Sequence, residues 1–143
     1  MNTFISVEFN QNLTMIKQFF KWIGLKEKLH NKEHVSPLFK EGEIWWSHFG
    51  ENVGTEMNGK GDFFTRPILI LKKYDKFSFL AIPLTTQHKE GTWYFTFTHN
   101  RKKQTAVLAQ ARIINYKRLK ERVGKVDSND YQGVKTAFIE LHK

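Results

Sequence analysis

The sequence RPILIL, residues Arg66–Leu71, is the strongest indicator of the fold. After its leading arginine the segment is continuously apolar, and a short run of this kind is typical of a strand buried on both faces. We therefore expect it in the centre of a sheet. Four further segments have strand character and short connections between them, and five such strands predict a small β-barrel. These segments are Glu43–Phe49, Phe77–Leu84, Thr92–Thr98 and Ala106–Ile114.

Helical patterns flank the strands. Apolar residues recur at helical spacing from Thr14 to His30, which predicts an amphipathic helix that packs on the barrel or, alternatively, binds a membrane surface. Tyr116–Val123 is predicted to be a short helix that stops at Gly124, and Ser128 is a suitable N-cap for a last helix. The predicted fold class is mainly β, with an N-terminal helix, a short helix and a C-terminal helix around about five strands.

The fourth predicted strand alternates strictly between large rings and smaller or polar side chains. Trp93, Phe95 and Phe97 occupy every second position, which indicates one face turned to the core. The alternative is that these rings form a platform on which nucleic-acid bases stack.

The net charge of the chain indicates a class of partner without deciding it. The 143 residues include 23 Lys and Arg against 14 Asp and Glu, a net charge of +9, so the chain attracts polyanions. Nucleic acid is the leading partner, and the alternative is that the charge only maintains solubility. The sequence has no cysteine, which excludes disulfides, thiol catalysis and thiolate zinc sites. Because no apolar segment approaches the length of a membrane span, we expect a cytoplasmic protein that does not bind membranes.

A candidate site follows from the ends of two predicted strands. Arg66 precedes Pro67 directly after Gly50–Thr65, a long polar segment that contains glycines and predicts a mobile loop. If the strands Arg66–Lys72 and Phe77–Leu84 form a hairpin, Thr85 lies near Arg66, and together they make a phosphate-sized site. The alternative is an exposed arginine beside two turn threonines. His30 and His34 lack a third ligand, so we predict no metal site.

Six segments, in this order along the chain, resemble the PemK/MazF toxin family. The match extends from Gly42 to the C-terminus, while the preceding residues are an addition to the family's fold. We accordingly divide the chain into a helical extension with its linker, residues 1–41, and a barrel domain, residues 42–143. The matching segments are Gly42–Trp46, Val53–Glu56, Arg66–Ile70, Ile82–Thr85, Leu108–Arg112 and Lys117–Leu119.

The resemblance implies an SH3-like barrel, a homodimer, a cognate antitoxin, and metal-independent cleavage of single-stranded RNA, usually messenger RNA, with no cofactor. It places Arg66 and Thr85 on the family's catalytic arginine and threonine, Glu56 on a glutamate associated with activity, and Gln110 on a glutamine near the site. The spacer between Glu56 and Arg66 is longer than in compact members of the family. Cleavage of this class leaves a 2′,3′-cyclic phosphate and a free 5′-hydroxyl.

The chemistry of the candidate residues limits their roles. An arginine with a pKa above about 12 is a poor base at neutral pH, but its planar guanidinium binds two phosphate oxygens at once. Arg66 is therefore predicted to stabilise the transition state, and Glu56 or water to act as the base. Because duplex RNA hides its base edges, we expect an unpaired strand as substrate. Lys60, His88, Lys89 and Arg112 are candidates for contacts with it.

Two other functions remain open, besides an antitoxin-bound or structural remnant whose site has decayed. One is an SH3-like module that binds nucleic acid without cutting it. The other is a toxin of the same fold that poisons gyrase, although the match at Arg66 and Thr85 argues against it.

Overall fold

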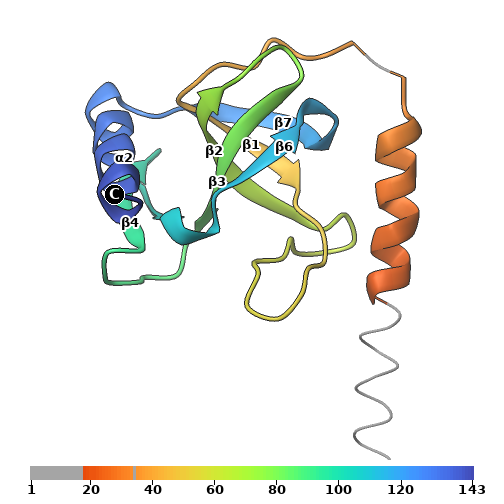
Figure 1. Cartoon of the computed structure of the whole chain (residues 1–143), viewed down its shortest axis with the longest axis horizontal. Helices are drawn as coiled ribbons and strands as arrows, with labels where there is room; N and C mark the ends of the chain where they lie inside the picture. Colours follow the sequence, from red (N-terminus) through yellow and green to blue (C-terminus); the bar gives the residue numbers. More distant parts are fainter. Residues whose placement is uncertain (1–17, 34) are drawn as a thin grey trace, which may run out of the picture.

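The computed structural model describes residues 18–33 and 35–143, so Thr14–Lys17 of the predicted helix and His34 lie outside the described residues. Within this part the fold is a curled antiparallel sheet with helices at its two ends, which confirms the predicted fold class (Figure 1). Its strands are β1 Glu43–His48, β2 Thr65–Lys73, β3 Ser78–Thr85, β4 Tyr94–His99, β5 Lys102–Val107, β6 Arg112–Asn115 and β7 Leu119–Lys125.

Strand β2 lies in the interior of the sheet, as its apolar sequence predicts. The order is β4-β5-β3-β2-β1-β7, with β6 on β3. Ile68 and Ile70 pack into one buried cluster with Phe39 and Phe79, while Leu69 belongs to a second cluster. The strand is thus buried on both faces, so the prediction for Arg66–Leu71 is confirmed.

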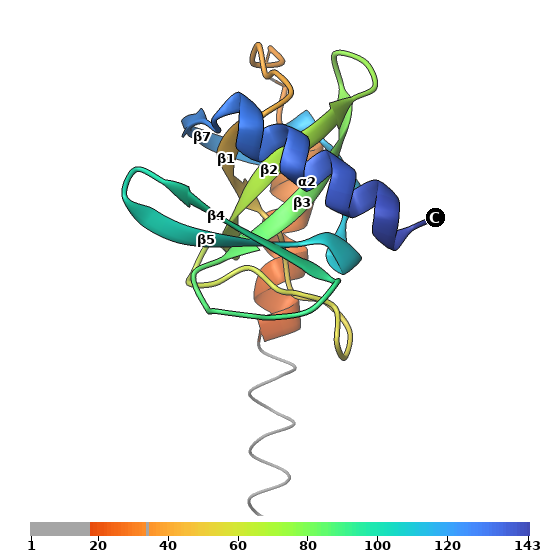
Figure 2. The same ribbon diagram turned by 90° about the vertical axis from the view of Figure 1, so that its left-hand side faces the viewer.

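The C-terminal helix α2, Ser128–Leu141, covers the second cluster (Figure 2). Its cap is Asp127, one residue before the predicted Ser128, and the Asp127 side chain accepts a hydrogen bond of 2.7 Å from the Asn129 amide. Val134 is buried in the cluster with Leu69. The Tyr131 hydroxyl donates to the Leu71 carbonyl at 2.8 Å, which ties the helix to β2.

The predicted strand Ala106–Ile114 is divided in two. Strand β5 ends at Val107, a 3-10 turn follows over Leu108–Gln110, and β6 then pairs with the other half of β3. Strand β5 begins at Lys102, because the β4–β5 hairpin turns at Asn100 and Arg101, both with positive φ. The sequence pattern missed this start because the hairpin end is polar and exposed.

Two further predictions were wrong. The short helix Tyr116–Val123 is a single 3-10 turn, Tyr116–Arg118, followed by the edge strand β7 on β1. Charged residues are common on edge strands because they discourage pairing with other chains, and here their spacing resembles that of a helix.

The prediction that Trp93 faces the core was also wrong. Trp93 is 58% exposed and lies just before β4, whereas Phe97 of the same predicted strand is buried.

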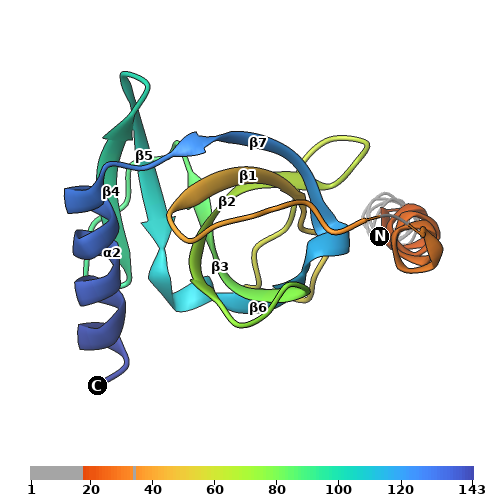
Figure 3. The same cartoon turned by 90° about the horizontal axis from the view of Figure 1, so that it is seen from above.

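The N-terminal helix, residues 18–31, lies at the opposite end of the sheet from α2 (Figure 3). Trp22 is 4% exposed and its ring centroid lies 5.6 Å from that of Phe64. Gly50 has a φ of +93°, and a β-carbon there would collide with the Trp22 ring. The helix therefore packs on the barrel, which favours the first of its two interpretations. No helix among the described residues is long and apolar enough to cross a membrane.

Candidate active site

Arg66 and Thr85 line the same cavity, which we call the Arg66–Thr85 pocket. Its volume is about 400 Å³, and Lys60 also lines it. Strands β2 and β3 pair with Ile68 opposite Pro83, so the hairpin that the sequence analysis required is present. Apolar walls from Trp46, Pro67 and Leu84 border these polar groups.

The Arg66 guanidinium is held by neutral acceptors. Its Nε donates to the Asn58 carbonyl at 2.7 Å, and its Nη1 donates to the Leu84 carbonyl at 3.1 Å. None of the ion pairs in residues 18–33 and 35–143 involves Arg66. Burial lowers the pKa of the guanidinium below its usual value. The side chain is thus fixed in direction, and its positive charge is available to an anion.

Thr85 ends β3 beside the carbonyl that Arg66 contacts. Its Oγ1 accepts a hydrogen bond from the Gln87 amide at 3.2 Å. Because a hydroxyl has one donor and two acceptor positions, the Thr85 proton can be directed to a phosphate oxygen. The side chain is half-buried, which leaves it accessible from the pocket.

Glu56 and Arg66 line a second cavity, which we call the loop pocket, of about 660 Å³. It lies between the N-terminal helix and the loop of residues 50–64. The Glu56 carboxylate accepts a hydrogen bond of 2.8 Å from the Val53 amide. Arg66 lines both cavities, whereas Thr85 lines the Arg66–Thr85 pocket and Glu56 the loop pocket. Arg66 therefore shares one cavity with each of the two other predicted catalytic residues, and neither of these two cavities is lined by both Glu56 and Thr85.

Gln110 holds the loop that carries Glu56. Its Oε1 accepts from the Met57 amide at 3.2 Å, and its Nε2 donates to the Thr55 carbonyl at 3.0 Å. These two bonds use both ends of the amide. Gln110 thus positions the backbone on either side of Glu56, a role that its place in the sequence did not indicate.

The other predicted RNA contacts are dispersed. Lys60 lines both pockets, and Arg112 lies over the Phe49 ring at 5.1 Å in a third cavity that Glu56 also lines. Burial lowers the pKa of Arg112, while the Glu56 charge raises it. His88 and Lys89 are exposed on the connection between β3 and β4, where His88 pairs with Glu90 at 3.1 Å. Neither of these two lines the Arg66–Thr85 pocket.

Several residues of the site were missed by sequence reasoning. Asn58 fixes Arg66 through its backbone, and a backbone contact leaves no sequence signal. Gln18 and Lys21 of the N-terminal helix line the loop pocket. In the part of the chain that the structure describes, no group of three His, Cys, Asp or Glu side chains could hold a metal ion.

Comparison with known proteins assigns the family. Residues 40–142 match the family described as the PemK-like, MazF-like toxin of type II toxin-antitoxin systems. The chain belongs to this family. The residues of this PemK/MazF-type toxin that precede position 40, including the N-terminal helix, lie outside the match. A search of curated proteins finds no match.

Solved structures show the same fold. MazF from Deinococcus radiodurans is 16% identical, with a TM-score of 0.58 over 76% of this chain and 98% of its own. A mycobacterial endoribonuclease is 13% identical, with a TM-score of 0.55 over 76% of this chain and 93% of its own. A mycobacterial endoribonuclease bound to its cognate antitoxin is 13% identical, with a TM-score of 0.53 over 70% and 90%. At these identities the likeness concerns the fold.

Proposed function

We propose that this toxin is a metal-independent endoribonuclease that cuts single-stranded RNA, as messenger RNA, in the Arg66–Thr85 pocket. The observation that carries the proposal is the Arg66 guanidinium, which is fixed by two carbonyl oxygens and adjoins Thr85. A preorganised cation of this kind stabilises charge that develops on a phosphate. The family assignment and the fold of the two solved endoribonucleases support the same function.

In the proposed reaction the 2′-oxygen of the RNA attacks the adjacent phosphorus. The new bond joins the 2′-oxygen to phosphorus, the bond from phosphorus to the 5′-oxygen breaks, and a 2′,3′-cyclic phosphate results. The general base that takes the proton of the 2′-hydroxyl is Glu56, which lines the loop pocket on the other side of Arg66, or a water molecule. Arg66 stabilises the pentavalent phosphate and gives a proton to the departing 5′-oxygen, and Thr85 orients a phosphate oxygen. Water then restores the protonation states of Glu56 and Arg66.

The partners of this reaction follow from the same proposal. Lys60 lines the pocket with Arg66 and is assigned to a phosphate next to the cleaved one, and Arg112 to a contact beyond it. We also assign the chain a cognate antitoxin, a homodimeric state and a cytoplasmic site of action. Residues 42–143 would form the catalytic domain, and residues 1–41 an extension.

The test is cleavage of single-stranded RNA in excess EDTA by the wild type, Arg66→Ala and Thr85→Ala. We expect the wild type to cut, and each variant to lose about 100-fold or more in rate, the usual cost of removing one preorganised donor. The matched control is Lys102→Ala, which removes one charge from the exposed start of β5; its rate should equal that of the wild type.

Each alternative predicts a different result. Bound but intact RNA with the wild type would indicate a non-catalytic module. If the wild type neither binds nor cuts RNA, the remaining function is the poisoning of a protein target such as gyrase. Loss of activity in EDTA would contradict the metal-independent reaction, and an Arg66→Ala variant as fast as the wild type would contradict the assigned site.

A further inference from the structure

A separate cavity lies where the N-terminal helix meets the barrel, and we call it the seam pocket. Its volume is about 290 Å³. The floor includes Trp22 and Leu29 of the helix, and three cations line it, Lys26 of the helix with Lys117 and Arg118 of the barrel. The seam pocket shares no residue with the Arg66–Thr85 pocket.

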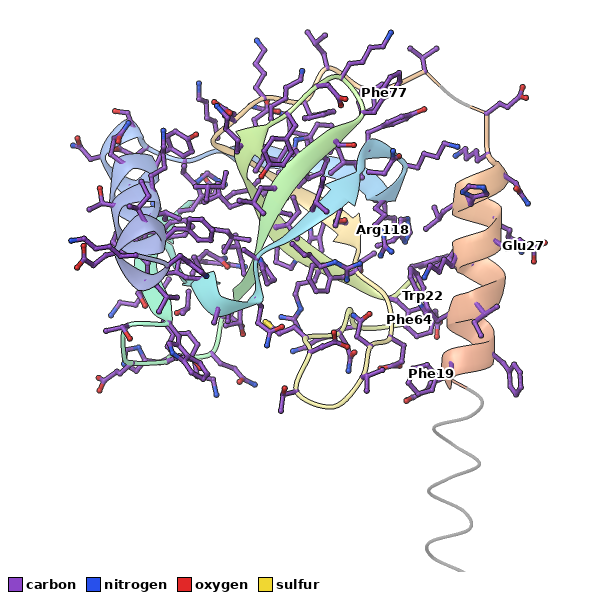
Figure 4. The ribbon with its side chains drawn as sticks, in the orientation of Figure 1. Phe19, Trp22, Glu27, Phe64, Phe77 and Arg118 are labelled. Carbon is purple, nitrogen blue, oxygen red and sulfur yellow. The ribbon has the colours of Figure 1, made fainter. Side chains whose placement is uncertain are left out.

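The positive charge of the seam pocket is not neutralised by carboxylates. No Asp or Glu lines it, and the ion pairs in the described ranges 18–33 and 35–143 include none of its three cations. Figure 4 shows Trp22 directed at Arg118, whereas Glu27 of the same helix points away from the barrel. A pocket with apolar walls and unneutralised cations suits an anion.

The Arg118 guanidinium is held between the barrel and the Trp22 ring. Its Nη1 donates to the carbonyls of His48 at 3.2 Å and Phe49 at 3.4 Å, and its guanidinium carbon lies 5.4 Å from the Trp22 ring. Burial, and secondly the charge of Arg112, lower its pKa to about 10, so it is protonated at neutral pH. Both of these hydrogen bonds to carbonyls come from Nη1.

His48, whose carbonyl binds Arg118, is affected by the same group of positive charges. Burial lowers the pKa of His48, although a hydrogen bond to the Phe63 carbonyl opposes this effect. The positive charges of Lys120, Arg118 and Lys32 lower the pKa further. The basic region therefore extends beyond the seam pocket along β7.

The seam pocket is also close to the candidate active site. Ser47 of β1 pairs with Arg66 of β2 on one side and with Leu119 of β7 on the other. Neighbouring strands are about 4.8 Å apart, so the backbones of Arg66 and of Leu119, the residue after Arg118, are at most about 10 Å apart. A short length of unpaired RNA spans this distance.

We propose that the seam pocket binds a backbone phosphate of the single-stranded RNA, outside the bond that is cut, with Lys26, Lys117 and Arg118 as its ligands. The inference rests on the proposed function, because the same strand occupies both sites. Lys26 lies in the helix that precedes the family match at residue 40, so this site extends the binding surface of the matched barrel. The N-terminal helix thereby becomes part of the RNA-binding surface.

The test is the salt dependence of binding to a fully 2′-O-methylated single-stranded RNA, which lacks the attacking hydroxyl and stays intact. Binding is measured by fluorescence anisotropy from low to high KCl for wild type, Lys26→Ala, Lys26→Arg and Lys28→Ala. Lys28 is the matched control, since two residues along a helix turn its side chain by about 200° from Lys26. Melting temperatures check that all four proteins are folded.

We expect Lys26→Ala to bind several-fold more weakly at low salt. Its plot of log K against log salt should be shallower by about 0.7, the contribution of one phosphate contact in a single strand. Lys26→Arg should restore the slope, and Lys28→Ala should match the wild type. A purely structural role for Lys26 would leave the slope unchanged.

Equal slopes for Lys26→Ala and Lys28→Ala would overturn the inference. The binding result for Lys26 and the cleavage result for natural RNA test the two proposals separately. A slope that depends on Lys26, with natural RNA left uncut, supports the seam pocket and rejects the nuclease. Cleavage of natural RNA with a slope independent of Lys26 supports the nuclease and rejects the seam pocket. A wild type that binds no RNA contradicts both proposals.

Discussion

The two carbonyl oxygens that hold Arg66 set the direction of its guanidinium before any substrate arrives. Asn58 and Leu84 supply them from the loop and from β3. Neither acceptor carries a charge, so the positive charge of the guanidinium is not neutralised by them and acts on the pocket. Replacement by lysine would keep the charge but lose this planar, two-point attachment.

A second buried charge, Glu43 of β1, has a structural role. Its carboxylate accepts hydrogen bonds from Arg122 Nε at 2.6 Å, the Lys40 amide at 2.7 Å and Trp45 Nε1 at 3.1 Å. Burial alone would raise the pKa of Glu43, but these bonds and the Arg122 charge outweigh it and leave the pKa below its usual value. The folded protein therefore favours the ionised form.

The sign of the pH effect follows from this lowered pKa. The unfolded chain binds the Glu43 proton more readily, so this contribution to stability is lost as the pH falls below about 4.3, the ordinary glutamate pKa. Glu43→Gln should lower the free energy of unfolding at pH 7 by about 1–3 kcal/mol, and the difference from wild type should narrow in acid. Urea unfolding at several pH values measures both, with exposed Glu121→Gln as control. A constant difference across the pH range would show that the ionisation of Glu43 does not stabilise the fold.

At the scale of elements, the pattern of apolar residues predicted the buried strands correctly and failed for the strands at the edges. Strand β2 was predictable because every position from Ile68 to Leu71 is buried. Strand β7 was not, because it pairs on one side with β1 and presents its charged residues to solvent. The division between β5 and β6 arises because β5 pairs with one half of β3 and β6 with the other half. This pairing depends on the tertiary structure.

The N-terminal helix depends on its contact with the barrel. Isolated helices of about 12–15 residues are marginal in water, and Trp22 is the buried anchor of this one. Trp22→Ala should release the helix, so trypsin should cut at Lys21, Lys26 and Lys28 much faster while the barrel still melts cooperatively. Phe20→Ala, at a position 69% exposed, is the control and should resist trypsin as the wild type does. Equal resistance of Trp22→Ala would show that the helix is held elsewhere.

For the whole molecule, the sequence placed Arg66 near Thr85 on the condition that their two strands form a hairpin, and the pairing of β2 with β3 meets that condition. The sequence was insufficient for Glu56, whose position depends on a loop shaped by Gln110 and by contacts within residues 50–64. It was also insufficient for the two pockets at the N-terminal helix, since each is lined jointly by the helix and by residues remote in sequence. Local patterns do not encode such contacts.

In the proposed reaction the ribose hydroxyl of the RNA is the nucleophile, and it attacks in the Arg66–Thr85 pocket. The most direct measurement is the identity of the new RNA ends, determined by mass spectrometry of the fragments produced in EDTA. The proposed reaction leaves a 2′,3′-cyclic phosphate on the upstream fragment and a 5′-hydroxyl on the downstream one. Fragments that carry a 3′-hydroxyl and a 5′-phosphate would contradict it, because water rather than the RNA would then have attacked the phosphorus.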